Sequence, residues 1–391
     1  RRQWAKHNRS ASFPGDLPPA AQEQAPHRRP RASPVRLRRP AARLRSRMAA
    51  SAADPGTTFK LLLSCPAGLP RSRVSVKFDR SFDRIPHSDA ALEESISEIW
   101  NQRLQQNPSL FNGTKFRYGG YSLHHKDDPN QEYCVSLHLG LTDYRTFVGT
   151  NLNPLWEKFL VPSEDDPVCC QHTSSPLGNG AIIETSDEKI IVLQRSYNVG
   201  EFPGYYVFPG GHSEPGEVGI MGHKTDEDLA HLCGRVSQEM FDGIIREVVE
   251  ETGVPAHSLT DPVFIGVSRR EMNVRPTAFF FTKCNIDSNG INELYSRAQD
   301  DYESTKLHAV SVEELRGMNQ RMPGCHNGGF ALYELMRNVA KKLARALFLR
   351  TELFWWQYGT TTSENKCGNM NGTYRNGAEY YSSDPCDYLP F

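Results

Sequence analysis

Apolar positions in the first part of this 391-residue chain alternate between strand-like runs and one helical stretch. The runs Phe59 to Ser64, Phe116 to Leu123 and Tyr133 to Leu139 each predict a strand. Between the first two runs, five apolar residues recur at helical spacing: Leu92, Ile96, Ile99, Trp100 and Leu104. This spacing predicts a helix from Ala90 to about Gln105. Residues 57–165 are therefore expected to form a small α/β domain.

The apolar pattern after a proline-containing linker near residues 162–178 is that of a mixed sheet covered by helices. Six strands are predicted, at residues 180–184, 189–194, 206–208, 263–268, 277–283 and 307–311. The first two form a hairpin, and a last helix is expected from about Gly329 to Leu343. The fold class is α/β of the mixed α+β kind, with a second domain at residues 166–340. Residues 341–391 are expected to be poorly ordered.

The charges are unevenly distributed along the chain. It holds 45 Lys and Arg against 46 Asp and Glu, but residues 1–47 contain 13 of the basic residues and only two of the acidic ones. We therefore expect residues 1–56 to be a disordered basic tail. Translation from Met48 would make most of that tail non-native, and a mitochondrial transit peptide or a nucleic-acid-binding arm are the other interpretations.

Composition excludes several classes of protein. There is no run of about 18 apolar residues, so a membrane span is not expected. Nine cysteines, an odd number without a CxxC pair, indicate neither a disulfide framework nor a structural zinc site. The chain is expected in a reducing compartment, the cytoplasm, or mitochondria if residues 1–47 are a transit peptide. A nucleic-acid partner is not expected, and no pattern fixes an oligomeric state.

The strongest chemical signal is a cluster of carboxylates after residue 246. Glu247, Glu250 and Glu251 are spaced i, i+3 and i+4, so they project from one face of a helix. Like charges this close repel one another, and hard oxygen ligands suit Mg²⁺ or Mn²⁺. The alternative is a solvated, glutamate-rich helix. Gly253 is expected to end the helix.

The context of these glutamates favours the metal site. The stretch Gly210 to Glu217 followed by Arg246 to Val254 resembles the Nudix box, in which a glycine turn leads to an Arg-Glu-apolar-any-Glu-Glu helix. The usual spacer between the first Glu and the Arg is about seven residues, whereas here it is 28, an insertion of 21. The insert is expected either to extend the metal helix backwards or to add a helix before it. Glu217 and Glu239 are both candidates for the first Glu of the box.

The split box, with Leu61 to Pro66, Lys115 to Arg117 and Leu139 to Arg145, is similar to the animal UDP-glucose pyrophosphatases of the Nudix superfamily. The resemblance covers roughly residues 58–335. It implies a Nudix α/β/α sandwich preceded by a smaller α/β domain. It also implies metal-dependent hydrolysis of UDP-glucose, and of UDP-galactose, to UMP and the sugar 1-phosphate, a small-molecule nucleotide-sugar substrate.

The resemblance also implies roles for particular residues. Glu247 and Glu251, with Glu250, are expected to hold Mg²⁺ or Mn²⁺ and so to activate a water molecule. Arg246 is expected to brace the box by pairing with a carboxylate. A general base is expected among these glutamates or at Glu303, whose alternative is a solvated loop position.

Five residues are expected to bind substrate: Phe111, Tyr144, Arg195, His212 and Glu214. Aromatic faces suit uracil, and a guanidinium suits a phosphate. His212 and Glu214 follow the glycine turn. Because these residues come from both domains, a site between them is expected. Taken singly, Phe111 and Tyr144 are also typical core residues.

Three other functions fit parts of the sequence. A Nudix hydrolase could act on ADP-ribose, coenzyme A or capped RNA, because the box contacts only the diphosphate and the metal. A non-catalytic nucleotide-sugar binding module would not need the complete glutamate set. An RNA-binding protein would depend on the basic tail, and its binding would weaken with salt.

Overall fold

A computed structural model describes residues 54–124, 133–162, 170–223, 229–298 and 304–358. The chain divides into two compact units, Arg1–Ala340 and Lys341–Phe391, of which the first holds the sheets and the site. The expectations for residues 1–53 and 359–391 lie outside the described residues.

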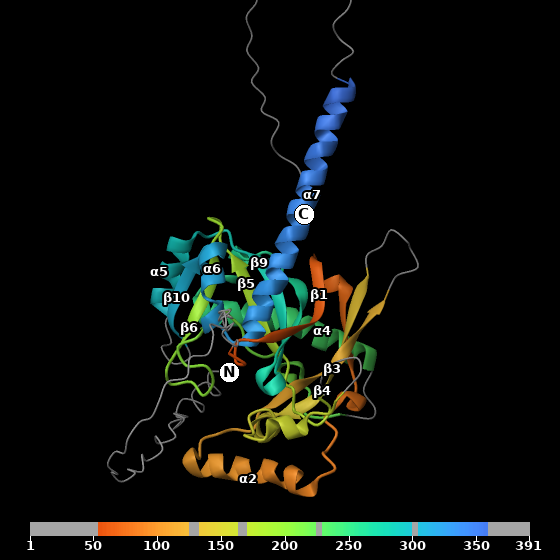
Figure 1. The fold of residues 1–391 in the computed structure, drawn as a ribbon, viewed down its shortest axis with the longest axis vertical. Helices are drawn as coiled ribbons and strands as arrows, with labels where there is room; N and C mark the ends of the chain where they lie inside the picture. The colour runs from red at the N-terminus through yellow and green to blue at the C-terminus, as the bar shows by residue number, and fades with distance from the viewer. Residues whose placement is uncertain (1–53, 125–132, 163–169, 224–228, 299–303, 359–391) are drawn as a thin grey trace, which may run out of the picture. The chain divides into compact units, whose positions relative to one another are not determined.

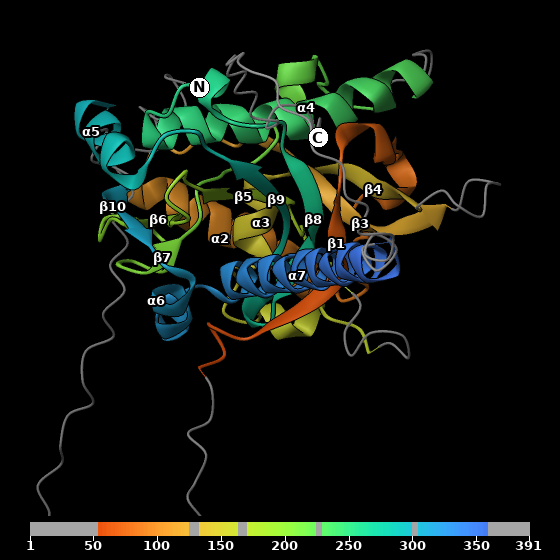
Figure 2. The same cartoon turned by 90° about the horizontal axis from the view of Figure 1, so that it is seen from above.

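The larger sheet has a mixed topology in the order β1-β8-β9-β5-β6-β10, with β7 paired to β6 (Figures 1 and 2). Its strands are β1 (Phe59–Leu69), β5 (Gly178–Glu184), β6 (Ile190–Arg195), β7 (Tyr206–Val207), β8 (Val263–Arg270), β9 (Pro276–Lys283) and β10 (Ser304–Val310). The β5–β9 pair is parallel and the other pairs are antiparallel. Consecutive residues Ala181, Ile182 and Ile183 are all buried. Since neighbouring side chains on a strand point to opposite faces, both faces of the sheet must be covered.

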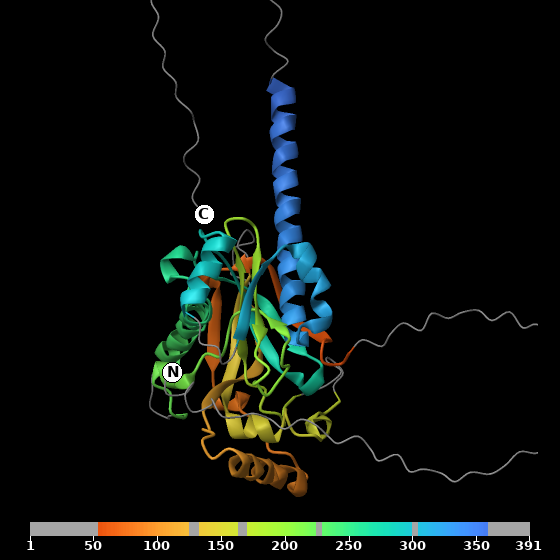
Figure 3. The same cartoon turned by 90° about the vertical axis from the view of Figure 1, so that its left-hand side faces the viewer.

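Helices cover the two faces of this sheet, as Figures 2 and 3 show. On one face lie α4 (Leu229–Thr252) and α5 (Ser288–Ala298), and on the other lie α6 (Val312–Gly317) and the first turns of α7 (Gly324–Tyr358). Leu332 and Tyr333 of α7 are buried in the core cluster on their face. The predicted α/β/α sandwich is therefore confirmed.

The first strand does not belong where the sequence pattern placed it. Strand β1 pairs antiparallel with β8, with Phe59 opposite Arg270, and so forms an edge of the larger sheet. An apolar run reads alike whichever sheet it joins, and the partner strand lies about 200 residues away, so periodicity could not identify it. The expected domain boundary near residue 165 stays a prediction. Strand β1 precedes this boundary in the sequence but belongs to the same sheet as β5 to β10, which follow it.

The smaller sheet has three strands, in the order β2-β4-β3. They are β2 (Val74–Phe78), β4 (Cys134–Asp143) and β3 (Thr114–His124), accompanied by helices α2 (Ala90–Gln106) and α3 (Tyr144–Gly149). The helix predicted from Ala90 is confirmed. The end of the linker pairs with β3, because the Leu177 N–H donates to the Phe116 carbonyl at 2.9 Å. The linker thus continues directly into β5 of the larger sheet.

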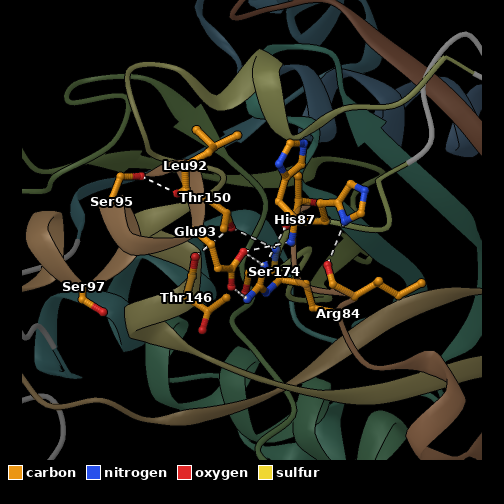
Figure 4. Close-up of polar contacts among 12 residues, drawn as sticks. Arg84, His87, Leu92, Glu93, Ser95, Ser97, Thr146, Thr150 and Ser174 are labelled. Carbon is orange, nitrogen blue, oxygen red and sulfur yellow. Dashed lines mark hydrogen bonds and ion pairs between the residues drawn. The ribbon is translucent and has the colours of Figure 1, made fainter. Parts of the chain in front are cut away.

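Polar contacts fix α2 and α3 to the segments around them, as Figure 4 shows. Arg84 forms an ion pair with Glu93 of α2, whose carboxylate also accepts from the His87 N–H at 2.9 Å. Thr150, at the end of α3, donates to the Thr146 carbonyl at 2.7 Å and accepts from the Ser174 N–H at 3.0 Å. Both helices are therefore held in place beside the linker.

Helix α4 distinguishes between the two structures expected for the insertion. It is one continuous helix from Leu229 to Thr252, so the insert extends the helix of Glu247, Glu250 and Glu251 backwards. Its buried stripe steps by four residues along the whole length: Leu232, Val236, Met240, Ile244 and Val248. The helix packs on β2 as well as on the larger sheet, and the Ser237 hydroxyl donates to the Val74 carbonyl at 2.8 Å.

Helix α7 is longer than the pattern predicted. It runs from Gly324 to Tyr358, beyond the expected end near Leu343. The expected poor order of residues 341–391 stays a prediction. From Phe330 to Tyr358 the chain has no Gly or Pro, and nothing interrupts the helix. None of the helices in the described ranges combines the length and apolar character needed to cross a membrane.

Candidate active site

A tight glycine turn follows β7 and lies against β5. The Asn179 N–H donates to the Gly211 carbonyl at 2.9 Å, and the Ala181 N–H donates to the Pro209 carbonyl at 2.8 Å. Gly210 has a φ of 155°, and a Cβ there would lie 2.1 Å from the Asn179 carbonyl oxygen. Only glycine fits this position, and its conformation directs the Gly210 N–H toward α4.

Two glutamates near the end of α4 contact this turn. Glu251 Oε2 accepts from the Gly210 N–H at 2.8 Å. The Glu247 carboxylate lies so close to Gly211 that a Cβ there would be 2.4 Å from Oε1. Ile244 and Val248 anchor the helix from its buried side, and Gly253, with a φ of 74°, ends it as predicted.

The third glutamate of the box is placed differently. Glu250 is exposed, whereas Glu247 and Glu251 are partly buried beside the turn. No three His, Cys, Asp or Glu side chains of the described residues converge as a metal-binding group. A set of two carboxylates still suits Mg²⁺, which is usually held by one or two carboxylates together with substrate phosphates and water. The three-carboxylate metal set stays a prediction.

Arg246 is braced by Glu239. The two side chains pair within α4 at 2.5 Å between Nη2 and Oε1, and Glu239 is only 5% exposed. Burial opposes the charge of Arg246, but the hydrogen bond and the charge of Glu239 outweigh it and raise the arginine pKa. Glu217 is exposed and acts on Arg246 through its charge. The structure thus brings Arg246 together with Glu239.

Two of the predicted substrate-binding residues, His212 and Glu214, have partners from other parts of the chain. His212 Nε2 accepts from Arg275 Nη2 at 3.0 Å, and Glu214 forms an ion pair with Lys115 at 2.7 Å. Lys115 comes from β3 of the smaller sheet, and its side chain is 6% exposed. A lysine of one sheet therefore meets the glycine turn of the other, a contact that the sequence analysis did not identify.

The two predicted aromatic residues lie in different environments. Tyr144 begins α3 and packs edge-on against Trp100, with 6.0 Å between ring centroids. Burial raises its pKa, and the charges of Arg103, Glu201 and Arg275 also act on it. Phe111 is 59% exposed in the loop before β3. Glu303, the predicted loop base, lies outside the described residues.

A pocket opens beside the glycine turn, and three arginines line it. We call it the arginine recess; its lining includes Arg195, Arg270, Arg275, His326, Glu201, Phe202, Gly210, Gly211 and Glu251. Arg195, a predicted substrate-binding residue, therefore lines the same pocket as the glycine turn and Glu251. The sequence analysis did not identify four of the lining residues: Arg270, Arg275, Glu201 and His326. The only signal was arginine at the end of an otherwise apolar strand.

Glu201 organises two of these arginines. Its carboxylate pairs with Arg270 Nη2 at 2.7 Å and with Arg275 Nη1 at 3.2 Å. Burial alone would raise the pKa of Glu201, but the two guanidinium charges outweigh it and hold the pKa at about 2. Arg270 is 1% exposed and stacks on Phe202, with 4.7 Å from its guanidinium carbon to the ring centroid.

The turn that connects Arg270 to Arg275 has an unusual backbone. Asn273 and Val274 have φ values of 53° and 47°, in the left-handed region that disfavours β-branched residues most. The Asn273 side-chain oxygen accepts from Arg270 Nε at 2.9 Å, and its carbonyl accepts from the Asn151 side chain at 2.8 Å. These bonds hold the strained turn between Arg270 and Arg275, the two residues of it that line the recess.

A second pocket adjoins the recess and shares Glu201 and Phe202 with it. Its other lining residues include Arg103, Asn151, Asn153 and Trp156. These come from α2 and from the segment after α3, so this pocket is bounded by elements of the expected N-terminal unit.

Comparisons with known proteins identify the family. No family model matches the chain. Over 300 residues, which cover 76% of this chain and 96% of the relative, it is 62% identical to Nudix hydrolase 9 of Arabidopsis thaliana. Over 267 residues, 67% of this chain and 86% of the relative, it is 32% identical to the human uridine diphosphate glucose pyrophosphatase NUDT22. The chain therefore belongs to the Nudix hydrolase family.

A solved structure of a MutT protein from Methanosarcina mazei aligns with 40% of this chain and 91% of its own, at a TM-score of 0.26 and 21% identity. The family assignment does not depend on this weaker likeness.

Proposed function

We propose that this Nudix hydrolase is a metal-dependent pyrophosphatase that cleaves UDP-glucose, and UDP-galactose, into UMP and the sugar 1-phosphate. One observation carries the proposal: Glu247 and Glu251 lie on the glycine turn at the edge of a recess lined by three arginines. Carboxylates on one side and guanidinium groups on the other suit a diphosphate that also binds a divalent cation. The relatedness to human NUDT22 supports the substrate.

The carboxylates would hold the metal, and the recess would hold the phosphates. Glu247 and Glu251 both lie against the turn, with Glu250 next to them on the exposed side. A bound Mg²⁺ or Mn²⁺ supplies charge neutralisation and lowers the pKa of an attacking water molecule. Arg195 and Arg275 add fixed positive charge where negative charge must be neutralised during cleavage.

The shape of the site favours an elongated substrate. The linings of the arginine recess and the second pocket share Glu201 and Phe202, so we propose that a substrate whose diphosphate occupies the recess has its other groups near the second pocket. The side chain of Trp156 in the second pocket offers an aromatic face and an indole N–H. Such groups suit a nucleobase or a sugar ring. We propose that Tyr144 and Phe111 contact the substrate on the side of the second pocket.

A substrate panel tests the proposal. The purified protein is incubated with Mg²⁺ or Mn²⁺ and with UDP-glucose, UDP-galactose, ADP-ribose, coenzyme A or capped RNA, and the products are separated by chromatography. We expect UMP from the two UDP-sugars at the highest rate. A higher rate with one of the other compounds would contradict the substrate assignment while keeping the pyrophosphatase class.

The metal role of the glutamates is tested separately. Glu247→Gln and Glu251→Gln are expected to reduce hydrolysis at least about a hundredfold, because each removes a carboxylate at the turn. Glu250→Gln is the matched control on the exposed side and is expected to cost less. Equal losses in all three variants would contradict the distinction between the two turn glutamates and Glu250.

A further inference from the structure

His326 lies in the first turn of α7 and lines the arginine recess. Its ring packs against Phe208 and Phe279, with 6.0 Å and 5.7 Å between ring centroids. Its Nδ1 accepts a hydrogen bond from the backbone N–H of Phe208 at 3.1 Å. Because a backbone N–H can only donate, Nδ1 carries no proton, and the proton of the neutral ring sits on Nε2.

The surroundings keep this ring neutral. Burial lowers the pKa of His326 well below its ordinary value, and the charges of Arg195, Arg275 and Arg270 lower it further. Within the described residues, Nε2 makes no hydrogen bond. His326 therefore offers a hydrogen-bond donor and no metal-binding lone pair at Nε2.

The charge of the recess selects the kind of ligand. Three guanidinium groups line it, and Glu201 pairs with two of them, whereas Glu251 lies on the side of the glycine turn, where it accepts from the Gly210 N–H. A cation would be repelled on the arginine side. An anion with several oxygens would find both positive charge and the neutral donor of His326.

We propose that the arginine recess is a phosphate-binding subsite in which His326 donates a hydrogen bond from Nε2 to a phosphoryl oxygen, alongside Arg195 and Arg275. The identity of that phosphoryl group as part of the substrate diphosphate rests on the proposed function. Phosphate binding by the recess does not rest on that function, because the subsite would bind any phosphate group small enough to enter. His326 is then a substrate-binding residue contributed by α7, outside the Nudix box.

Two substitutions separate phosphate binding from a structural role. In His326→Asn the short amide can keep the acceptor near the Phe208 N–H, but it presents no donor where Nε2 was. In His326→Gln the longer amide can restore that donor, but it gives up the bond to Phe208. A structural histidine would be replaced better by asparagine, and a phosphate-binding histidine better by glutamine.

The test is a phosphorus NMR titration of inorganic phosphate with the metal-free protein in EDTA, together with thermal unfolding of each variant. We expect phosphate binding to weaken about tenfold or more in His326→Asn, as a hydrogen bond to a charged group requires. His326→Gln should bind within about threefold of the wild type. His308→Asn, which changes a histidine of β10 that packs on Tyr206 and does not line the recess, should not alter binding.

Unchanged phosphate binding in His326→Asn would overturn the proposal. So would weaker binding in His326→Gln than in His326→Asn at equal thermal stability. Absence of UMP formation from UDP-glucose would contradict the proposed function only, since the titration uses neither a nucleotide nor a metal.

Discussion

Replacing Glu201 with glutamine removes the carboxylate on which the recess is built. That carboxylate bonds Arg270, which is 1% exposed, and Arg275, whose Nε is buried without a hydrogen-bond partner in the described part of the chain. A neutral amide cannot balance either guanidinium charge. The variant leaves Arg270 buried beside a strained turn with no carboxylate partner.

The magnitude follows from the pKa of Glu201. Its value of about 2 in the folded protein, against an ordinary 4.5, corresponds to about 3 kcal/mol of stability at neutral pH. The side chain is 19% exposed, so solvent screens it little. Because the folded pKa is depressed, this contribution is complete above pH 4.5. It is lost as the pH falls from 4.5 toward 2.

The assay is urea unfolding of the wild type and of Glu201→Gln at pH 7 and at several values below 4.5. We expect the variant to be about 3 kcal/mol less stable at pH 7 and the difference to shrink as the pH falls. Glu293→Gln is the matched control, since Glu293 pairs with Arg297 on an exposed helix face and should matter little. Equal stability at pH 7, or a difference that does not change below pH 4.5, would refute the reasoning.

Three further substitutions test other parts of the structure. Glu239→Gln should lower the unfolding free energy by about 1–2 kcal/mol because it breaks the pair with Arg246, whereas Glu217→Gln, at an exposed position, should change it little in the same urea assay. Gly210→Ala should cost at least about 2 kcal/mol in thermal unfolding, and Gly216→Ala, which has open space around it, should cost less. Arg117→Met should cost about 3 kcal/mol in urea unfolding because Arg117 is 5% exposed and donates to three carbonyls, those of Phe82, Cys170 and Thr173; full stability in this variant would contradict that role.

Local patterns predicted most of the elements and the β5–β6 hairpin, but not the pairing of strands far apart in the sequence. Helix α2 and the glycine that ends α4 follow from spacing and from residue type at positions next to one another in the sequence. The continuous α4 was also within reach, because the step of four residues from Leu232 to Val248 is never broken across the insertion. The pairing of strand β1 could not be predicted in this way, because its partner β8 is determined by tertiary packing.

The sequence predicted only those parts of the candidate site that the Nudix box or the family resemblance covers. Glu247 and Glu251 lie on the glycine turn that precedes them in the box. Glu201 meets Arg270 and Arg275 across about 70 residues, and His326 enters from another helix. No spacing rule connects such residues, because the folded sheet and not the local chain brings them together.

Hydrolysis of UDP-glucose in oxygen-18 water tests the central claim most directly. We predict UMP and glucose 1-phosphate in equal amounts, with the heavy oxygen on one of the two phosphates, in the presence of Mg²⁺. Both products should disappear with EDTA and in Glu251→Gln. Formation of UDP and free glucose, or full activity in Glu251→Gln, would contradict the account.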